Sequence, residues 1–145
     1  ITLTNPEMKR FFMTKDDAIN LIISAATIAK GGETFVLKMP LIRLKDLFDS
    51  MKEVLASKYG YKPSQIKTKI IGIRPGEKLI EYLLTKFEME HVLETKDFFI
   101  IPSLNISRKQ ISYPNIQKSK NDKLYFENMS TLSKQEISSI LKKLY

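Results

Sequence analysis

The stretch IIGIRPGEK, Ile70–Lys78, decides the fold class of this chain. Residues 66–73 alternate apolar side chains with Lys and Thr and then turn apolar, which predicts a strand entering a core. Pro75 and Gly76 end that pattern, and the spacing of the next apolar residues predicts a short helix through Leu79, Ile80, Leu83 and Leu84. A strand, a tight turn and a helix in succession indicate a chain that mixes the two kinds of element.

The same alternation extends to both sides of this stretch. Strands are predicted at residues 1–4, 34–38 and 97–101. Amphipathic helices are predicted from Thr14 to Gly31, from Leu44 to near Gly60, and over the last dozen residues. Capping boxes at Thr14/Asp17 and Ser133/Glu136 mark two helix starts, and the first helix carries enough apolar residues to be well covered. The fold class is therefore α/β, or α+β if the chain is a fragment.

Three segments follow from composition. Residues 1–102 form the domain, residues 103–131 lack periodicity and are predicted to be an extended arm, and residues 132–145 form a final helix. The chain begins at Ile1 without an initiator methionine, which we interpret as a cut inside a longer protein, although a processed start would look the same. No glycine-rich dinucleotide fingerprint occurs, so the nucleotide-binding half of a doubly wound fold is missing.

Composition restricts the function classes. The net charge of +8 suggests nucleic acid, but 20 Lys against 4 Arg, scattered without an aromatic stripe, favour a solvated surface. The absence of cysteine and the single His91 argue against a thiolate or histidine-rich metal site and favour a reducing cytoplasm. The longest apolar stretch, residues 21–29, is far shorter than the roughly 20 residues of a membrane span. We expect no metal, no nucleic acid and no membrane span.

Two arginines stand where an anion could bind. Arg74 lies at the predicted turn before a helix start, where free backbone N–H groups favour a phosphate, and Glu77 could accept hydrogen bonds from a sugar hydroxyl. Arg10, flanked by aromatic residues after a strand, could meet a phosphate or stack on a base. Each site also has a simpler interpretation. Arg74 and Glu77 would then form a surface ion pair at an ordinary turn, and Arg10 would be a surface residue beside two core phenylalanines.

Four stretches together resemble a known family. They are 3–14 (LTNPEMKRFFMT), 30–36 (KGGETFV), 69–78 (KIIGIRPGEK) and 97–101 (DFFII). In this order and spacing they resemble the C-terminal, substrate-binding portion of extended short-chain dehydrogenase/reductases of the CapD-like polysaccharide biosynthesis group. The closest resemblance is to UDP-N-acetylglucosamine 4,6-dehydratases of the PseB-like type, which invert C5. Lys9 and Asn5 depart from the usual pattern and put fine substrate specificity in doubt.

The resemblance implies roles for four residues. Arg74 would hold the nucleotide diphosphate, Glu77 would contact the nucleoside, and Arg10 and Thr4 would complete the substrate site. It also implies a UDP-N-acetylhexosamine substrate, NADP or NAD in the parent enzyme, a missing N-terminal Rossmann half, a homo-oligomer and a cytoplasmic location. We expect this chain alone to bind no cofactor and to hold no catalytic residue, so its own status as an enzyme stays uncertain.

Tyr82 and Lys86 match the Tyr-x-x-x-Lys pair of the superfamily, but they follow the IRPGEK stretch instead of lying in the cofactor-binding half. We assign both to an amphipathic helix, and His91 to the surface. Alternatives remain: a UDP-sugar 4-epimerase or a C5-retaining dehydratase of the same family, a stand-alone basic module for nucleic acid or acidic partners, and an inert, domain-swapped fragment.

Overall fold

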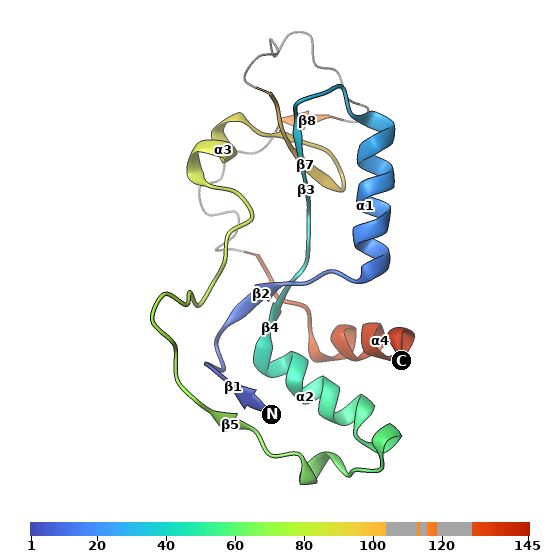
Figure 1. Ribbon diagram of the computed structural model, residues 1–145, viewed down its shortest axis with the longest axis vertical. Helices are drawn as coiled ribbons and strands as arrows, with labels where there is room; N and C mark the ends of the chain where they lie inside the picture. The colour runs from blue at the N-terminus through green and yellow to red at the C-terminus, as the bar shows by residue number, and fades with distance from the viewer. Residues whose placement is uncertain (104–112, 114–115, 119–128) are drawn as a thin grey trace. The chain divides into compact units, whose positions relative to one another are not determined.

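The computed structural model of the protein describes residues 1–103, 113, 116–118 and 129–145. Contacts divide the chain into two compact units (Figure 1). Unit 1 combines Ile1–Phe12, Pro40–Glu81 and Ser130–Tyr145, and unit 2 combines Met13–Met39 and Tyr82–Met129. Each unit is thus assembled from segments far apart in sequence, whereas the predicted division into domain, arm and final helix followed chain order and stays a prediction.

Unit 1 contains two strand pairs and two helices. β1 (Thr2–Leu3) runs parallel to β5 (Lys69–Ile70), and β2 (Lys9–Phe11) runs antiparallel to β4 (Leu41–Arg43). The remaining elements are α2 (Leu44–Leu55), the short 3₁₀ turns η1 (Ser57–Tyr59) and η2 (Pro63–Gln65), and α4 (Lys134–Leu144). The strand pairs place Leu3 opposite Ile70 and Arg10 opposite Ile42.

The core of unit 1 lies between α2 and α4, which Figure 1 shows side by side. Ile42, Ile137 and Leu141 are its buried centre, and half-buried residues of α2 pack against them together with Phe12 and Leu132. Ser50, fully buried on α2, donates a hydrogen bond to the Lys134 carbonyl at 3.3 Å. The core therefore fixes β4, and through the β2–β4 pairing it also fixes the strand that carries Arg10.

Unit 2 is an antiparallel sheet with a helix alongside it. The order is β3 (Thr34–Leu37), β7 (Phe98–Ile101), β6 (Leu93–Glu94) and β8 (Gln117–Lys118). α1 (Lys15–Ile28) runs beside the sheet in Figure 1, and α3 (Lys86–His91) precedes β6. The core is built on Phe98, Ile100 and Tyr113, with Leu21 and Ile28 of α1 packed against it.

Most long elements confirm the sequence predictions. The structure is mixed α/β, with helices at 15–28, 44–55 and 134–144 and strands at 34–37 and 98–101. Thr14 and Asp17 form a reciprocal capping box, and Ser133 and Glu136 form another. These signals depend on residues close in sequence, which is why the sequence alone reveals them.

The predicted helix through Leu79–Leu84 is wrong. No helix lies between β5 and α3 in the structure. The chain there is instead hydrogen-bonded to β2, because the Lys9 N–H donates to the Leu79 carbonyl at 2.8 Å. The helix begins instead at Lys86, where Thr85 and Glu88 form a capping box that the predicted elements did not include. The strand predicted at 66–73 is also shorter, because the observed strand comprises only Lys69–Ile70.

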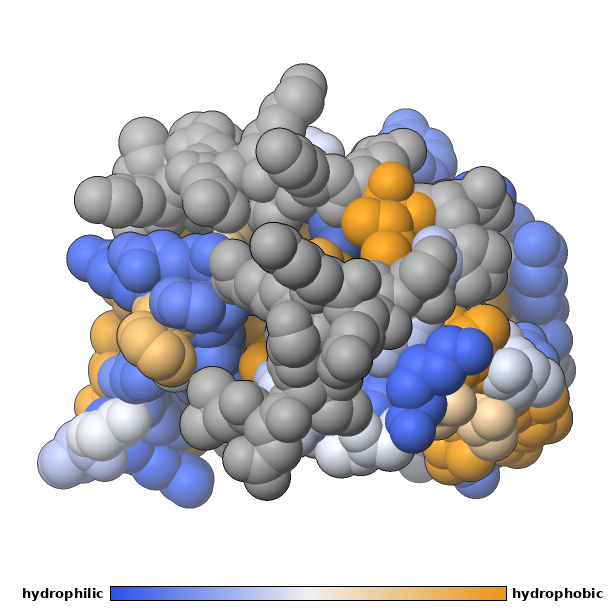
Figure 2. Space-filling model, turned by 90° about the horizontal axis from the view of Figure 1, so that it is seen from above, coloured by the Kyte–Doolittle hydropathy of each residue, from blue (hydrophilic) through white to orange (hydrophobic). Residues whose placement is uncertain are grey.

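The expectation that the first helix is well covered is also wrong. No residue of α1 is buried, and Ile19, Ile22 and Ile23 are 52%, 67% and 59% exposed. The helix contacts the core of unit 2 through Leu21 and Ile28 only along one side. Orange atoms in Figure 2 show that apolar side chains reach the surface in this view.

Among the described residues of the predicted arm at 103–131, β8 pairs with β6 and Tyr113 is buried. Residues 104–112, 114–115 and 119–128 of that arm lie outside the described residues. Among the described residues, no helix is long and apolar enough to cross a bilayer.

Candidate functional site

The IRPGEK stretch forms a closed turn. The Glu77 N–H donates to the Arg74 carbonyl at 3.1 Å, and Pro75 and Gly76 occupy the two central positions. Gly76 has a φ of 85°, the positive value that the third residue of a type II turn requires. The Arg74 N–H in turn donates to the Glu77 carboxylate at 2.9 Å. Two hydrogen bonds in opposite directions therefore join the two ends of this turn.

Thr4 and the turn lie beyond the carboxyl ends of two paired parallel strands. Thr4 follows β1, and the Ile71 N–H donates to the Leu3 carbonyl at 3.0 Å, which continues the pairing one step past β5. Carboxyl ends of adjacent parallel strands open at the same edge, which is where α/β proteins bind ligands. The structure thus places half-buried Thr4 and the chain leading to Arg74 at one edge of unit 1.

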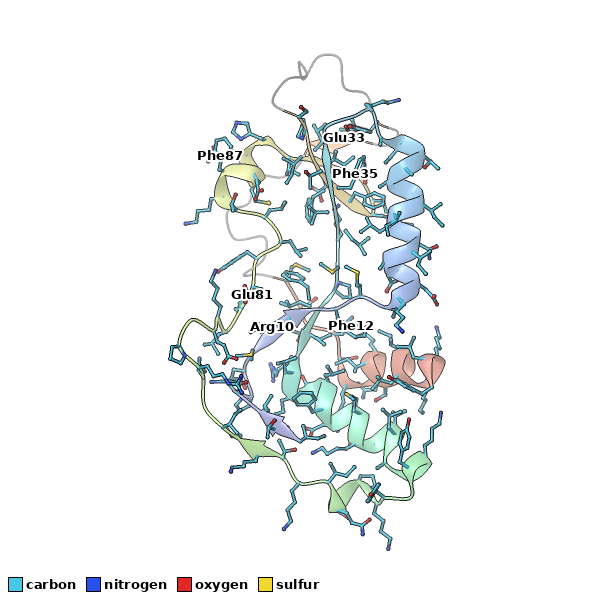
Figure 3. All side chains as sticks on the ribbon, viewed as in Figure 1. Arg10, Phe12, Glu33, Phe35, Glu81 and Phe87 are labelled. Atoms are coloured by element: carbon cyan, nitrogen blue, oxygen red, sulfur yellow. The ribbon has the colours of Figure 1, made fainter. Side chains whose placement is uncertain are left out.

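Arg10 is attached to the segment after the turn. Its Nη1 donates to the carbonyls of Lys9 at 2.7 Å, Lys78 at 3.0 Å and Leu79 at 3.4 Å. Arg10 is half-buried on β2 and is labelled in Figure 3. The sequence indicates Arg10 but not these partners, because main-chain carbonyls leave no signal in the sequence.

The charges of two arginines at this site are not balanced by carboxylates. Among the described residues, neither Arg10 nor Arg74 forms an ion pair. Arg43, by contrast, lies 3.9 Å from carboxylate oxygens of both Glu7 and Asp46. The acceptors of Arg10 in the described part of the chain are neutral carbonyls, and Arg74 is exposed. The positive charge of each therefore stays available to an anion.

The other candidates form no site. Tyr82 is 51% exposed and precedes α3, whereas Lys86 is the first residue of that helix, so the expected shared amphipathic helix is wrong. His91 is exposed, stacks on Phe87 with ring centroids 4.7 Å apart, and places Nδ1 2.9 Å from the Phe87 carbonyl. Within the described part of the chain, no three His, Asp or Glu residues cluster as metal ligands.

These features define an α/β protein with a positively charged turn at the carboxyl end of a parallel strand pair. The chain belongs to the polysaccharide biosynthesis protein family, whose model matches residues 1–103. All four candidate site residues lie inside the matched region.

Known proteins from several organisms are similar to this chain. An uncharacterised membrane protein of Methanocaldococcus jannaschii is 42% identical over 99% of this chain and 41% of its own length. The capsular polysaccharide biosynthesis protein CapD of Staphylococcus aureus is 42% identical over 61% of this chain and 14% of its own. A UDP-glucose 4-epimerase of Rickettsia canadensis is 31% identical over 70% of this chain and 28% of its own.

The crystal structure of Pen from Bacillus thuringiensis superposes with a TM-score of 0.75 at 38% identity, over 99% of this chain and 41% of Pen. The chain therefore spans about two fifths of the length of Pen and of the Methanocaldococcus relative. The fold class and the family of the chain are therefore established.

Proposed function

We propose that this chain binds the diphosphate of a nucleotide sugar on the Arg74–Glu77 turn. The observation that carries the proposal concerns the charges of Arg10 and Arg74. Among the described residues neither forms an ion pair with a carboxylate, and both lie at the same segment of unit 1, since Arg74 begins the turn and Arg10 donates to the Lys78 carbonyl just after it. A relative named for a UDP-sugar activity supports the substrate class, since it matches 70% of this chain.

Each site residue has a distinct role in this proposal. Arg74 approaches the diphosphate with its planar guanidinium, which matches phosphate oxygens bidentately. Glu77 uses Oε2 to hold the turn and offers Oε1 to a ribose hydroxyl. Arg10 adds positive potential beside the turn, and Thr4 offers a hydroxyl at the end of β1. No residue of this chain is assigned to proton or hydride transfer.

We further propose that the whole protein is a C5-inverting UDP-N-acetylglucosamine 4,6-dehydratase. Such an enzyme oxidises C4, eliminates water across C5 and C6, and returns the hydride. NADP or NAD would be the hydride acceptor of such an enzyme. The five glycines of this chain form no dinucleotide fingerprint, so the residues present do not fit that cofactor. We therefore assign this chain binding and orientation of the substrate only. Cytoplasmic location and homo-oligomeric assembly remain predictions.

A UDP-sugar 4-epimerase is the second candidate, because the matching relatives include several of that name at about 30% identity. The products separate the two. The intact protein, incubated with NADP or NAD and UDP-N-acetylglucosamine, would release a sugar nucleotide lighter by one water if it is a dehydratase. An epimerase would release an isomer of unchanged mass.

The binding proposal is tested by calorimetric titration of the intact protein with UDP and with UDP-N-acetylglucosamine. We expect Arg74→Ala to weaken binding at least about tenfold, the scale of one charged hydrogen-bonding contact. Arg43→Ala is the matched control, since Arg43 is already ion-paired in unit 1, and it should leave affinity within about twofold. Equal losses in the two variants, or no binding by the intact wild type, would refute the diphosphate site.

A further inference from the structure

We infer that Arg10 is a positioning residue, which acts by holding the main chain that follows the Arg74–Glu77 turn. The inference rests on the proposed function of that turn and assigns Arg10 a different task from direct capture of the phosphate. Its Nη1 is within 3.4 Å of three main-chain carbonyls, and two of these belong to Lys78 and Leu79, directly after the turn.

Arg10 is well placed to act as a fixed support. It stands opposite Ile42 in the β2–β4 pair, and Ile42 is 2% exposed at the centre of the unit 1 core. Two residues before Arg10, Met8 is also 2% exposed, and its carbonyl accepts the Leu44 N–H at 2.9 Å. The backbone that carries this guanidinium is therefore held by the core before any ligand arrives.

The segment that Arg10 holds has few supports of its own. Residues 71–85 contain no helix or strand, and the Leu79 carbonyl accepts the Lys9 N–H in addition to the contact with Arg10. Residues 71–76, 78 and 79 are exposed. The position of the turn thus depends on a few hydrogen bonds, and those from Arg10 join it to a strand 68 residues earlier in the chain.

The chemistry of this contact is specific to arginine. A planar guanidinium directs its donors in a fixed fork, so one nitrogen can serve neighbouring carbonyls while the group stays rigid. A lysine ammonium keeps the charge on a flexible stem and lacks that geometry. Because the acceptors are neutral carbonyls, the guanidinium also keeps its charge beside the turn.

The test compares Arg10→Lys with Arg10→Met in UDP titrations of the intact protein, each alone and combined with Arg74→Ala. If Arg10 acts through the turn, Arg10→Lys weakens binding about tenfold despite its retained charge, as does Arg10→Met. In the Arg74→Ala background Arg10→Lys, which keeps the charge, should cost less than about twofold, because the turn no longer contacts the phosphate. Wild-type affinity in Arg10→Lys, or losses that simply multiply, would overturn the inference.

Amide hydrogen exchange provides a readout that needs no nucleotide. In Arg10→Lys we expect faster exchange at the amides of Lys9 and Glu77, while the β3–β7 amides of unit 2 keep wild-type rates. Unchanged exchange at Lys9 and Glu77 would overturn the positioning role even if UDP binds. Faster exchange there in a protein that does not bind UDP would uphold the positioning role and refute only the proposed function.

Discussion

The Glu77 carboxylate accepts the Arg74 backbone N–H at 2.9 Å, while the Glu77 N–H donates back to the Arg74 carbonyl at 3.1 Å. Both hydrogen bonds between Arg74 and Glu77 therefore use the main chain of Arg74. The Arg74 guanidinium takes part in neither of them. From the sequence, Glu77 is expected to accept a hydrogen bond from a sugar hydroxyl. The structure shows that one of its oxygens first stabilises the turn that presents Arg74.

Glu77→Ala should weaken UDP binding about five- to tenfold, because loss of one hydrogen bond loosens the turn and costs about 1 kcal/mol. Titration calorimetry measures this directly. Glu136→Ala is the matched control, since that carboxylate also accepts a backbone N–H, from Ser133 at 2.7 Å, in the capping box of α4. The control should lower the free energy of unfolding by about 0.5–2 kcal/mol and leave UDP affinity unchanged. Equal effects of the two variants on affinity would contradict this account.

Gly76→Ala should also weaken UDP binding. A Cβ at this position meets no atom within 4 Å, so the cost comes from backbone strain at a φ of 85°, about 1 kcal/mol. Gly60 has a φ of 78° and equally open surroundings, so Gly60→Ala should lose similar stability in urea unfolding. Only the Gly76 variant should lose affinity for UDP. If Gly60→Ala impairs binding equally, the strain acts on the whole unit and not on the turn.

Local signals explain why so much of the secondary structure could be predicted. The capping boxes at Thr14/Asp17 and Ser133/Glu136 involve residues three apart, and the stripe of α2 repeats within one helix. β2 and β4 are not predicted from the sequence because three-residue strands carry too little periodicity, and their pairing joins residues about thirty positions apart. Arg74 was singled out by the predicted turn and Arg10 by its aromatic neighbours, and the family resemblance then assigned both to one substrate site.

The false helix at Leu79–Leu84 shows where local reasoning fails. Its apolar spacing satisfies a helical pattern, but the carbonyls of Lys78 and Leu79 have partners on β2 that a helix would compete for. The chain there is irregular, and the carbonyls of Lys78 and Leu79 accept hydrogen bonds from Lys9 and Arg10 of β2 instead. The same contacts are the part of the candidate site that sequence could not reveal.

The exposed isoleucines of α1 should tolerate substitution by polar residues with little loss of stability. Ile22 is 67% exposed, so Ile22→Gln should change the free energy of unfolding by less than about 0.5 kcal/mol. Its neighbour Leu21 packs against the Phe98, Ile100 and Tyr113 cluster, and Leu21→Ala should cost about 1–3 kcal/mol. Urea unfolding of both variants measures the difference. A large loss in Ile22→Gln would mean that this side of α1 is covered in solution.

Tyr113 should make stability depend on pH in the alkaline range. Burial, with a contribution from the neighbouring Glu33 carboxylate, raises the pKa of Tyr113 from 10.0 to about 12. The folded state therefore favours the neutral phenol. This stabilisation is fully present below pH 10, the unfolded value, and is lost as the pH rises toward 12, because the unfolded chain ionises first.

Between about pH 9 and 11 the wild type should lose about 1 kcal/mol more than Tyr113→Phe in the free energy of unfolding, since phenylalanine has no proton to release. Urea titrations at the two pH values give this difference. Tyr59→Phe is the matched control, because Tyr59 is 62% exposed and should keep the wild-type dependence. Parallel pH profiles for wild type and Tyr113→Phe would show that the Tyr113 phenol is not buried in the native protein, and would place the core of unit 2 in doubt.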